Sequence, residues 1–421
     1  MRRLASGVFL AILFAAAVYG QESSQDSIDR WFEGAPRADL HWFVNVERPT
    51  LSRYQRLRTR FVIGVEEDEM ARRSGHGRLL MMIRVRGRDG KSYDSDHLVD
   101  LRQSPFSTAE KLSRTDWIST AFVVPDDYQV SFALADLETG EHNLARRKLH
   151  VAPLSSDPLA DPWRGLPAFE FILPVDPPEN WFLPQIRSRL HLPLETARPV
   201  RVQVVVNASV SETSPLAQRR TSQTLALLVG ALRTLSEIDV RNGTLSLTVL
   251  DIARRREIFR QDSPGALDWP RLKPALDADN QRTIDAGDLK NRGRNARYFV
   301  RQIAERIDAP AGDPGLRVLI VLTPPVEFPP GTDRTPIEPP ADSHYRAFYI
   351  RYQTASAHGG VPAAFAGVPY APPRPLPRLP RPLPDQLADT MKPLHPRVFE
   401  VFTPLDFRKA LGAILKEVSR N

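Results

Sequence analysis

The stretch Asn207-Ala208-Ser209-Val210-Ser211 holds the residues with the clearest chemical potential, and it directly follows an apolar run over residues 201–206. Hard cations such as Mg²⁺ prefer carboxylate and hydroxyl oxygens as ligands. Ser209 and Ser211 supply two hydroxyls, whereas Asn207 supplies only one neutral amide oxygen. We therefore expect metal affinity here to be weak or absent. In the alternative interpretation, Asn207 and its neighbours only form the turn between a strand and a helix.

Other motifs with catalytic or metal-binding potential are incomplete. Gly90-Lys91-Ser92 ends like a phosphate-binding loop, but Val85 stands where that motif needs its first glycine. Residues 277–288 have acidic or amide residues at positions 1, 3, 5 and 12 of a calcium loop, but Arg282 replaces its essential glycine, so we expect a solvated loop. The nine histidines form no H-x-x-x-H pair, and no G-x-S-x-G motif is present. We therefore expect no enzyme and no cofactor.

A basic, proline-rich insert occupies residues 361–384, with nine prolines and the cationic residues Arg374, Arg378 and Arg381. Such a composition predicts an exposed, polyproline-like arm. The arm could touch an anionic envelope surface or an acidic partner. In the alternative interpretation it is an inert solvated loop.

The first twenty residues are typical of a cleavable secretory signal peptide. Arg2 and Arg3 precede an uncharged stretch of about 15 residues, too short for a stable anchor, and Val18-Tyr19-Gly20 suits cleavage before Gln21. We expect export to the periplasm or medium, with an uncleaved anchor as the alternative. No later segment is apolar enough to span a membrane. The chain has no cysteine, which excludes disulfides and thiolate metal sites, and its charges are interspersed, which disfavours nucleic acid as a partner.

The first half of the mature chain predicts an all-β unit. A flexible leader (21–37) precedes residues 38–152, where period-two alternation is broken by turns such as Asp89-Gly90 and Thr139-Gly140. About seven short strands in roughly 110 residues predict an immunoglobulin-like sandwich. We expect these strands at residues 41–47, 58–65, 79–86, 97–102, 117–123, 129–136 and 145–151. Val124-Pro125-Asp126-Asp127-Tyr128 is similar to the P-x-G-x-Y entry to a strand in such sandwiches.

The second half predicts alternating strands and helices. Residues 153–198 are rich in proline and aromatic residues and read as a connector packed on one or both neighbours. From residue 199 onward we expect strands at 201–206, 245–251, 256–260, 316–322, 347–352 and 397–402. The helical repeat predicts helices at 216–238, 289–307 and 405–418. This order favours a three-layer, Rossmann-like α/β domain over residues 199–421.

The C-terminal region resembles a von Willebrand factor A-like domain, on the strand ending in Val204-Val205-Val206, the following Asn207–Ser211 loop and long helix, and the later strand Val318–Thr323. In that family the loop reads D-x-S-x-S and holds a Mg²⁺ or similar ion that captures an acidic group. Here Asn207 replaces the aspartate, Thr323-Pro324-Pro325 stands where an acidic residue is usual, and Thr283 is the nearest candidate for the completing threonine.

The resemblance implies assembly or adhesion rather than catalysis, and the pairing with a sandwich is similar to that in bacterial exported proteins. We therefore expect a non-enzymatic protein-interaction or scaffolding protein that works without Mg²⁺ or Mn²⁺. One alternative is a glycan- or cell-wall-binding protein that uses exposed aromatic residues of the sandwich, such as Trp42 or Trp117. A second alternative is a hydrolase with an unrecognised site.

Overall fold

The computed structural model divides the chain into two compact units. It describes residues 40–102, 114–172, 186–209, 215–262, 264–280, 290–308, 315–326, 336–342, 344–352 and 385–420, with residues 29, 31, 32, 287, 328 and 332. The β-unit comprises Met1–Thr50, Leu57–Pro153 and Pro167–Leu173. The α/β-unit comprises Leu51–Arg56, Leu154–Leu166 and Pro174–Asn421. The expected signal peptide, the proline-rich insert, Ser211 and Thr283 lie outside the described residues.

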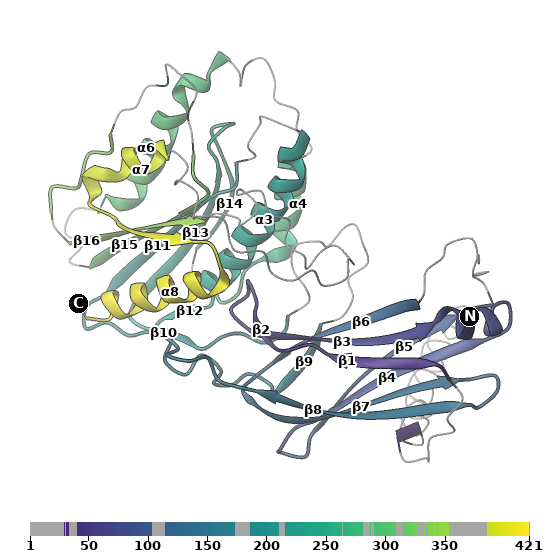
Figure 1. Cartoon of the computed structure of the whole chain (residues 1–421). Coiled ribbons are helices and arrows are strands. Elements are labelled where there is room, and N and C mark those ends of the chain that lie inside the picture. The colour runs from purple at the N-terminus through teal and green to yellow at the C-terminus, as the bar shows by residue number, and fades with distance from the viewer. Residues whose placement is uncertain are drawn as a thin grey trace, which may run out of the picture. The chain divides into compact units, whose positions relative to one another are not determined.

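Two antiparallel sheets form the β-unit (Figure 1). The first has the order β1 (Trp42–Val46), β3 (Leu57–Glu66), β6 (Arg114–Val123) and β9 (Phe169–Ile172), with β2 (Thr50–Leu51) also paired to β3. The second has the order β5 (Ser92–Asp100), β4 (Arg78–Arg86), β7 (Asp126–Asp136) and β8 (His142–Val151). The expected hairpins are confirmed, since Gly90 and Gly140 adopt positive φ angles of 77° and 74° in the turns between β4 and β5 and between β7 and β8.

An aromatic core joins the two sheets of the β-unit. Phe61 of β3 lies 6.2 Å from Phe132 of β7, and Phe169 of β9 lies 5.9 Å from Tyr128 of β7, between ring centroids. The Tyr128 hydroxyl shares its single proton between the carbonyl oxygens of Val124 (3.0 Å) and Ala168 (2.7 Å). A buried tyrosine is stabilised when its hydroxyl finds such partners, so the core also fixes the start of β7.

Three features of the β-unit differ from the sequence prediction. Strand β5 spans Ser92–Asp100 rather than 97–102, and β9 lies within the residues expected to form the connector. A short helix, α2 (Glu67–Arg73), follows β3 and was not predicted. Buried charge holds α2 in place: Arg73 pairs with Glu69 in the same helix and donates from Nε to Asp136 Oδ2 at 2.7 Å.

A six-stranded sheet forms the centre of the α/β-unit. Its order is β14 (Arg256–Asp262), β13 (Gly243–Asp251), β11 (Val200–Asn207), β15 (Leu316–Thr323), β16 (Tyr345–Tyr352) and β17 (Arg397–Val401). All neighbours are parallel except β14, which pairs antiparallel with β13. The central strands β11 and β15 are apolar and almost wholly buried, as expected for a sheet covered on both faces. A separate parallel pair joins β10 (Leu192–Leu194) to β12 (Ile238–Val240).

Helices cover both faces of this sheet (Figure 1). On one face α6 (Asn295–Ile307) and α7 (Gln386–Met391) pack through Phe299, Ile303 and Leu387 against alternate residues of β11, β15 and β16. On the other face Phe407 of α8 (Pro404–Val418) contacts Tyr352 at 6.0 Å between ring centroids. Helix α3 (Pro215–Ser236) connects β11 to β13 and contacts both strands.

The remaining helices include one that corrects the sequence prediction. Residues 277–288 were expected to form a solvated loop, but Asp277 lies in α4 (Trp269–Asn280), where its Oδ2 accepts from Lys273 Nζ at 2.7 Å. Helix α6 begins at Asn295, after a short 3-10 turn at Arg292–Arg294, rather than at residue 289. No helix within the described ranges is long and apolar enough to cross a membrane.

Two segments that interrupt the sequence of the β-unit, residues 51–56 and 154–166, pack onto α8. Arg408 of α8 is fully buried and donates to both oxygens of Asp157, at 2.7 and 2.6 Å. Its third guanidinium nitrogen donates to the Gln55 carbonyl oxygen at 2.9 Å, and the guanidinium lies 4.8 Å above the centre of the Trp163 ring. A Cβ at Gly412 would lie 2.8 Å from the Pro158 carbonyl oxygen, so glycine permits this close approach.

We predict that Arg408→Met lowers the free energy of unfolding of the α/β-unit by about 3–5 kcal/mol, because it leaves the Asp157 carboxylate without its buried partner. The matched control is Arg397→Met, which removes an exposed ion pair with Glu417 and should cost less than about 1 kcal/mol. Urea unfolding followed by tryptophan fluorescence measures both. Equal, small effects would show that the buried pair contributes little.

Candidate functional site

Parallel strands bring their carboxyl ends to one edge of the sheet, and polar residues end the central strands here. Strand β11 ends at Asn207, β13 at Asp251 and β15 at Thr323. The register places Val206 opposite Leu322 and Asn207 opposite Leu250. Asn207, Asp251 and Thr323 are all buried. Ligands of open α/β sheets bind outside the carboxyl ends of the strands, so this edge is the first place to look for a site.

The Asn207 side chain bonds within the protein through both its nitrogen and its oxygen. Its Nδ2 donates to Thr323 Oγ1 across the β11–β15 boundary at 3.0 Å. Its Oδ1 accepts from the backbone nitrogen of Ser209 at 3.1 Å and from Ser209 Oγ at 2.6 Å. An amide oxygen offers two lone pairs, and both are engaged.

The Ser209 hydroxyl is saturated as well. It donates its single proton to Asn207 Oδ1 and accepts from the backbone nitrogens of Ile252 (2.6 Å) and Ala253 (3.1 Å). A hydroxyl has one donor and two acceptor positions, and all three are occupied. The loop after β11 is therefore bonded to the loop after β13 through one side chain.

The carboxylates at this edge are paired with arginines. Asp251 is fully buried and accepts from Arg254 Nη1 at 2.8 Å and from the Arg254 backbone nitrogen at 3.1 Å. Sequence reasoning missed Asp251, although a carboxylate at the end of a predicted strand is the signal that could have found it. Asp385, the N-cap of α7, lies 3.0 Å from Arg351 Nε and accepts from the Tyr349 hydroxyl at 2.8 Å.

Burial, and secondarily the negative charge of Asp385, raises the pKa of Tyr349 well above its ordinary value. Tyr349 therefore remains a neutral hydrogen-bond donor at any physiological pH. A tyrosine held in this way stabilises the start of α7 and offers no acid or base near neutrality.

A divalent ion does not fit the described residues of the loop after β11, which are Ala208 and Ser209. The oxygens of Asn207 and Ser209 already accept or donate in every available direction, and Thr323 donates its proton to the Pro324 carbonyl oxygen at 2.8 Å. The nearby carboxylate of Asp251 is neutralised by Arg254. Ser211, the third residue of the predicted set, lies outside the described residues. The described part of the loop is arranged as a hydrogen-bonded turn.

Other predicted site residues lie elsewhere or outside the described ranges. Arg374, Arg378 and Arg381 of the basic arm are not described. Trp42 and Trp117 were named as exposed aromatic residues, and this is wrong: both are half-buried, in β1 and β6. Their register partners, Val65 and Ile63 of β3, are buried core residues.

One surface cluster in the β-unit has metal-ligand chemistry. His41 Nδ1 lies 3.3 Å from Asp68 Oδ2 and 4.0 Å from Glu66 Oε2, and all three side chains are exposed. The short distance to Asp68 is a hydrogen bond. Exposed acidic and imidazole groups in water adopt this arrangement without an ion, so the cluster is explained by its own contacts.

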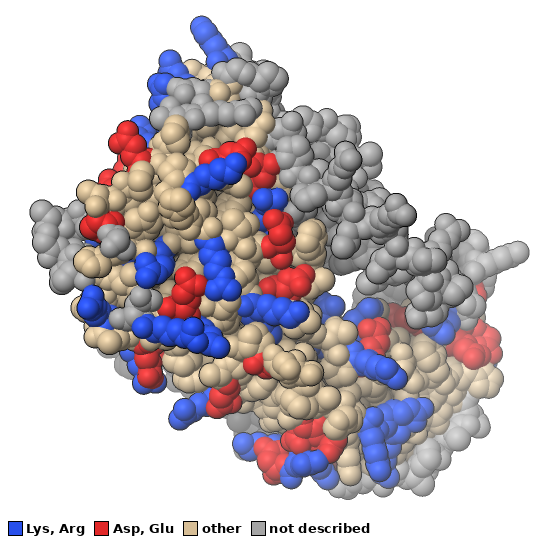
Figure 2. Space-filling model, turned by 60° about the vertical axis from the view of Figure 1, so that its left-hand side comes forward, with Lys and Arg blue, Asp and Glu red and all other residues tan. Residues whose placement is uncertain are grey.

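One face of the molecule shows no large patch of a single charge among its described residues (Figure 2). Figure 2 shows one face of the molecule, on which the basic and acidic side chains drawn in colour are interleaved. Such interleaving is typical of a solvated surface and not of a nucleic-acid footprint.

Comparisons with known proteins do not assign the chain to a family. No family model matches it, and no curated protein matches it. Among solved structures, the X-ray structure of the Northeast Structural Genomics Consortium target SoR45 is 12% identical, over 29% of this chain and 95% of that one, with a TM-score of 0.18. A crystal structure described as the ApaA protein of Bordetella pertussis is also 12% identical, over 28% of this chain and 97% of that one, with a TM-score of 0.18. Neither likeness supports an inference about fold or function.

We predict that Ser209→Ala lowers the free energy of unfolding by about 1–3 kcal/mol, because it leaves the amides of Ile252 and Ala253 without an acceptor. Ser155→Ala, at an exposed position of the same unit, is the control and should change stability by less than about 0.5 kcal/mol. Urea unfolding followed by circular dichroism measures both. If Ser209→Ala were as stable as the parent, the hydroxyl would not be the structural link that its contacts indicate.

Proposed function

We propose that this chain is an exported, non-enzymatic protein-binding component, with a von Willebrand factor A-like α/β-unit that works without a metal ion. One observation carries the proposal: at the carboxyl edge of the sheet, the side-chain oxygens of Asn207 and Ser209 are fully occupied by hydrogen bonds within the protein itself. Oxygens that are bonded in this way are not available as ligands of a cation. It is suited to hold the shape of a surface, which is what recognition of another protein requires.

The strand order supports the A-like interpretation of the α/β-unit. Counted in chain order, the strands of the six-stranded sheet lie as 3-2-1-4-5-6. That is the doubly wound order, whose switch point lies between the first and fourth strands. Here those strands are β11 and β15, and the bond from Asn207 to Thr323 crosses between their ends. The degenerate loop therefore occupies the position where a relative with an intact site would bind its ligand.

The sheet pairing supports an immunoglobulin-like interpretation of the β-unit. With β1, β3, β4, β5, β6, β7 and β8 taken as strands A, B, C, C′, E, F and G, the sheets read A-B-E, with β9 added beside E, and C′-C-F-G. This is the division of an immunoglobulin-type sandwich. The bond from the Tyr128 hydroxyl to the Val124 carbonyl oxygen, four residues upstream, is the contact of a tyrosine corner in such domains.

The charges at the carboxyl edge favour binding over catalysis. A general acid or base needs a titratable group that can reach a substrate and whose proton is available near the working pH. Asp251 and Asp385, the described carboxylates discussed above, are buried and paired with Arg254 and Arg351. Carboxylates that are buried against arginines in this way are not presented to a substrate.

Affinity capture of the exported chain from its native envelope, in parallel buffers with EDTA and with millimolar Mg²⁺, tests the proposal. We predict that a stoichiometric protein partner is recovered equally in both buffers, because no bridging ion is involved. The control is the affinity tag on an unrelated exported protein. Failure to recover a stoichiometric protein would contradict protein binding, and recovery in Mg²⁺ alone would contradict independence from metal.

A sedimentation assay with insoluble cell-wall polymer separates the proposal from glycan binding. A protein-binding component stays in the supernatant, whereas a wall-binding protein sediments with the polymer. Half-burial of Trp42 and Trp117 disfavours glycan binding, because stacking on sugars needs exposed aromatic faces.

A further inference from the structure

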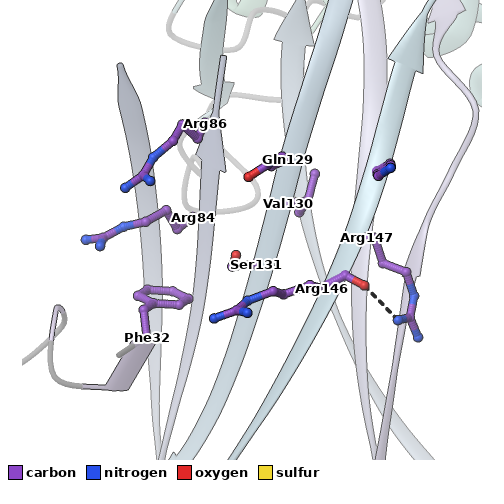
Figure 3. A pocket seen from close by; sticks show the side chains of 9 residues that line it. Phe32, Arg84, Arg86, Gln129, Val130, Ser131, Arg146 and Arg147 are labelled. Carbon is purple, nitrogen blue, oxygen red and sulfur yellow. Dashed lines mark hydrogen bonds between the residues drawn. The ribbon is translucent and has the colours of Figure 1, made fainter. Parts of the chain in front are cut away.

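A basic hollow lies on the outer face of the β5-β4-β7-β8 sheet (Figure 3). Its volume is about 600 Å³, and it is open to solvent. The lining comes from Phe32, which precedes the first strand, and from strands β4, β7 and β8. The lining residues are Phe32, Arg84, Arg86, Gln129, Val130, Ser131, Arg146, Arg147 and Lys148. More than half of them are cationic, on a chain whose charges are otherwise interspersed.

Strand register arranges the polar lining in two parallel rows. One row runs across the sheet as Arg84, Ser131 and Arg146, which are successive register partners. The next row runs as Arg86, Gln129 and Lys148 in the same way. Alternate residues of a strand face the same side, so the rows are about 7 Å apart. Each row presents cationic groups at its two ends with a neutral hydrogen-bonding side chain between them.

Arg84 shows which ligand this face accepts. It donates from Nε and Nη2 to the two oxygens of Asp94, at 2.8 Å each, and from Nη2 to Asp29 at 2.5 Å. Hydrogen bonding to Asp94, and then to Asp29, raises the pKa of Arg84. Phe32 lies against the same guanidinium, 4.7 Å from its centre, and packs on Met82 and Ala133. The segment that contains Asp29 and Phe32 is distant from Arg84 in sequence. It places a carboxylate and an aromatic ring at the edge of the hollow.

The remaining cations of the two rows are exposed, and no carboxylate among the described residues pairs with them as Asp94 does with Arg84. Arg86 is exposed and donates to Ser92 Oγ at 3.3 Å. Arg146 and Lys148 are exposed, and no described carboxylate lies within ion-pair distance of them. Figure 3 shows the Arg146 side chain directed across the face beside Ser131, whereas Arg147 points away on the far side of its strand. Three uncompensated cations of the rows therefore converge on one hollow.

We propose that this hollow binds an acidic segment of a partner polypeptide in extended conformation, with carboxylates on alternate residues. The spacing of alternate residues in a strand is about 7 Å, which equals the separation of the two rows. Arginine pairs with carboxylates through parallel hydrogen bonds, as Arg84 does with Asp94, and Gln129 and Ser131 can bond the peptide backbone between them. The inference deepens the proposed function, on which it rests, by naming the partner's chemistry and its binding surface.

Fluorescence anisotropy with a labelled peptide of alternating Glu and Ser residues tests the inference on the exported chain. The test variant is Arg146→Gln/Lys148→Gln, which removes one cation from each row. The matched control is Arg48→Gln/Lys409→Gln, which removes the same two residue types from exposed positions outside the hollow. We expect saturable binding to the parent and the control. In the test variant the dissociation constant should rise about tenfold or more, since each row loses charge-assisted hydrogen bonds to the peptide.

The outcomes separate the alternatives. Absence of saturable binding to the parent, or equal weakening in the control, would overturn the inference. A second arm uses phosphatidylglycerol vesicles: binding of vesicles but not peptide, lost in the test variant, would assign the hollow to a membrane surface instead. If the peptide does not bind while envelope capture still yields a stoichiometric protein, the proposed function stands and only this surface is wrong.

Discussion

The α/β-unit depends on one buried cation. Arg408 sits within an otherwise apolar helix face, and its charge is compensated by Asp157 and by the carbonyl oxygen of Gln55, from segments about 250 and 350 positions away in the sequence. Because an unpaired buried charge is costly, α8 can pack on the sheet only when both segments are in place. The segments 51–56 and 154–166 therefore belong to the α/β-unit, although their neighbours in sequence belong to the β-unit.

Hydrophobic periodicity was sufficient to predict most of the strands and the long helices. The strand expected at 316–322 is observed as β15, and the helix expected at 405–418 is observed as α8, each within one residue. These elements bury one or both faces, so their patterns carry a clear signal. Helix α2 has no apolar period. Its Arg73 pairs with Glu69 four positions earlier and also with Asp136, a contact that only the fold creates. Strand β9 lies in a proline-rich stretch, and this composition predicted a connector there rather than a strand.

The candidate site shows the same division between local and distant information. The sequence indicated Asn207 and Ser209 as the residues to examine, and the structure places both at the switch point of the strand order. Their saturation could not be predicted, since it depends on Thr323, more than a hundred positions later, and on the amides of Ile252 and Ala253. Likewise, the two rows of the basic hollow arise from register between β4, β7 and β8, and the run Arg146-Arg147-Lys148 supplies only one end of each row.

The two units thus suggest different contributions to one role. In the α/β-unit, the polar side chains at the carboxyl edge of the sheet form hydrogen bonds that join the loops after β11 and β13. In the β-unit, exposed cations remain available on a sheet face. The Asn207 side chain carries no charge that would attract a cation, and its Nδ2 donates to Thr323 Oγ1. A single residue thus accounts for both the neutral loop and the bond between the ends of β11 and β15.

Thermal melting of the purified chain in millimolar Mg²⁺ or Mn²⁺, compared with EDTA, tests the central claim most directly. An ion that binds only the folded state stabilises it by about 2.7 kcal/mol at a hundredfold excess over its dissociation constant, which corresponds to a rise in Tm of roughly 5–10 °C. The account predicts the same Tm in all three solutions. A metal-dependent rise in Tm that Ser209→Ala abolishes would show that the loop after β11 holds an ion, and would contradict the account.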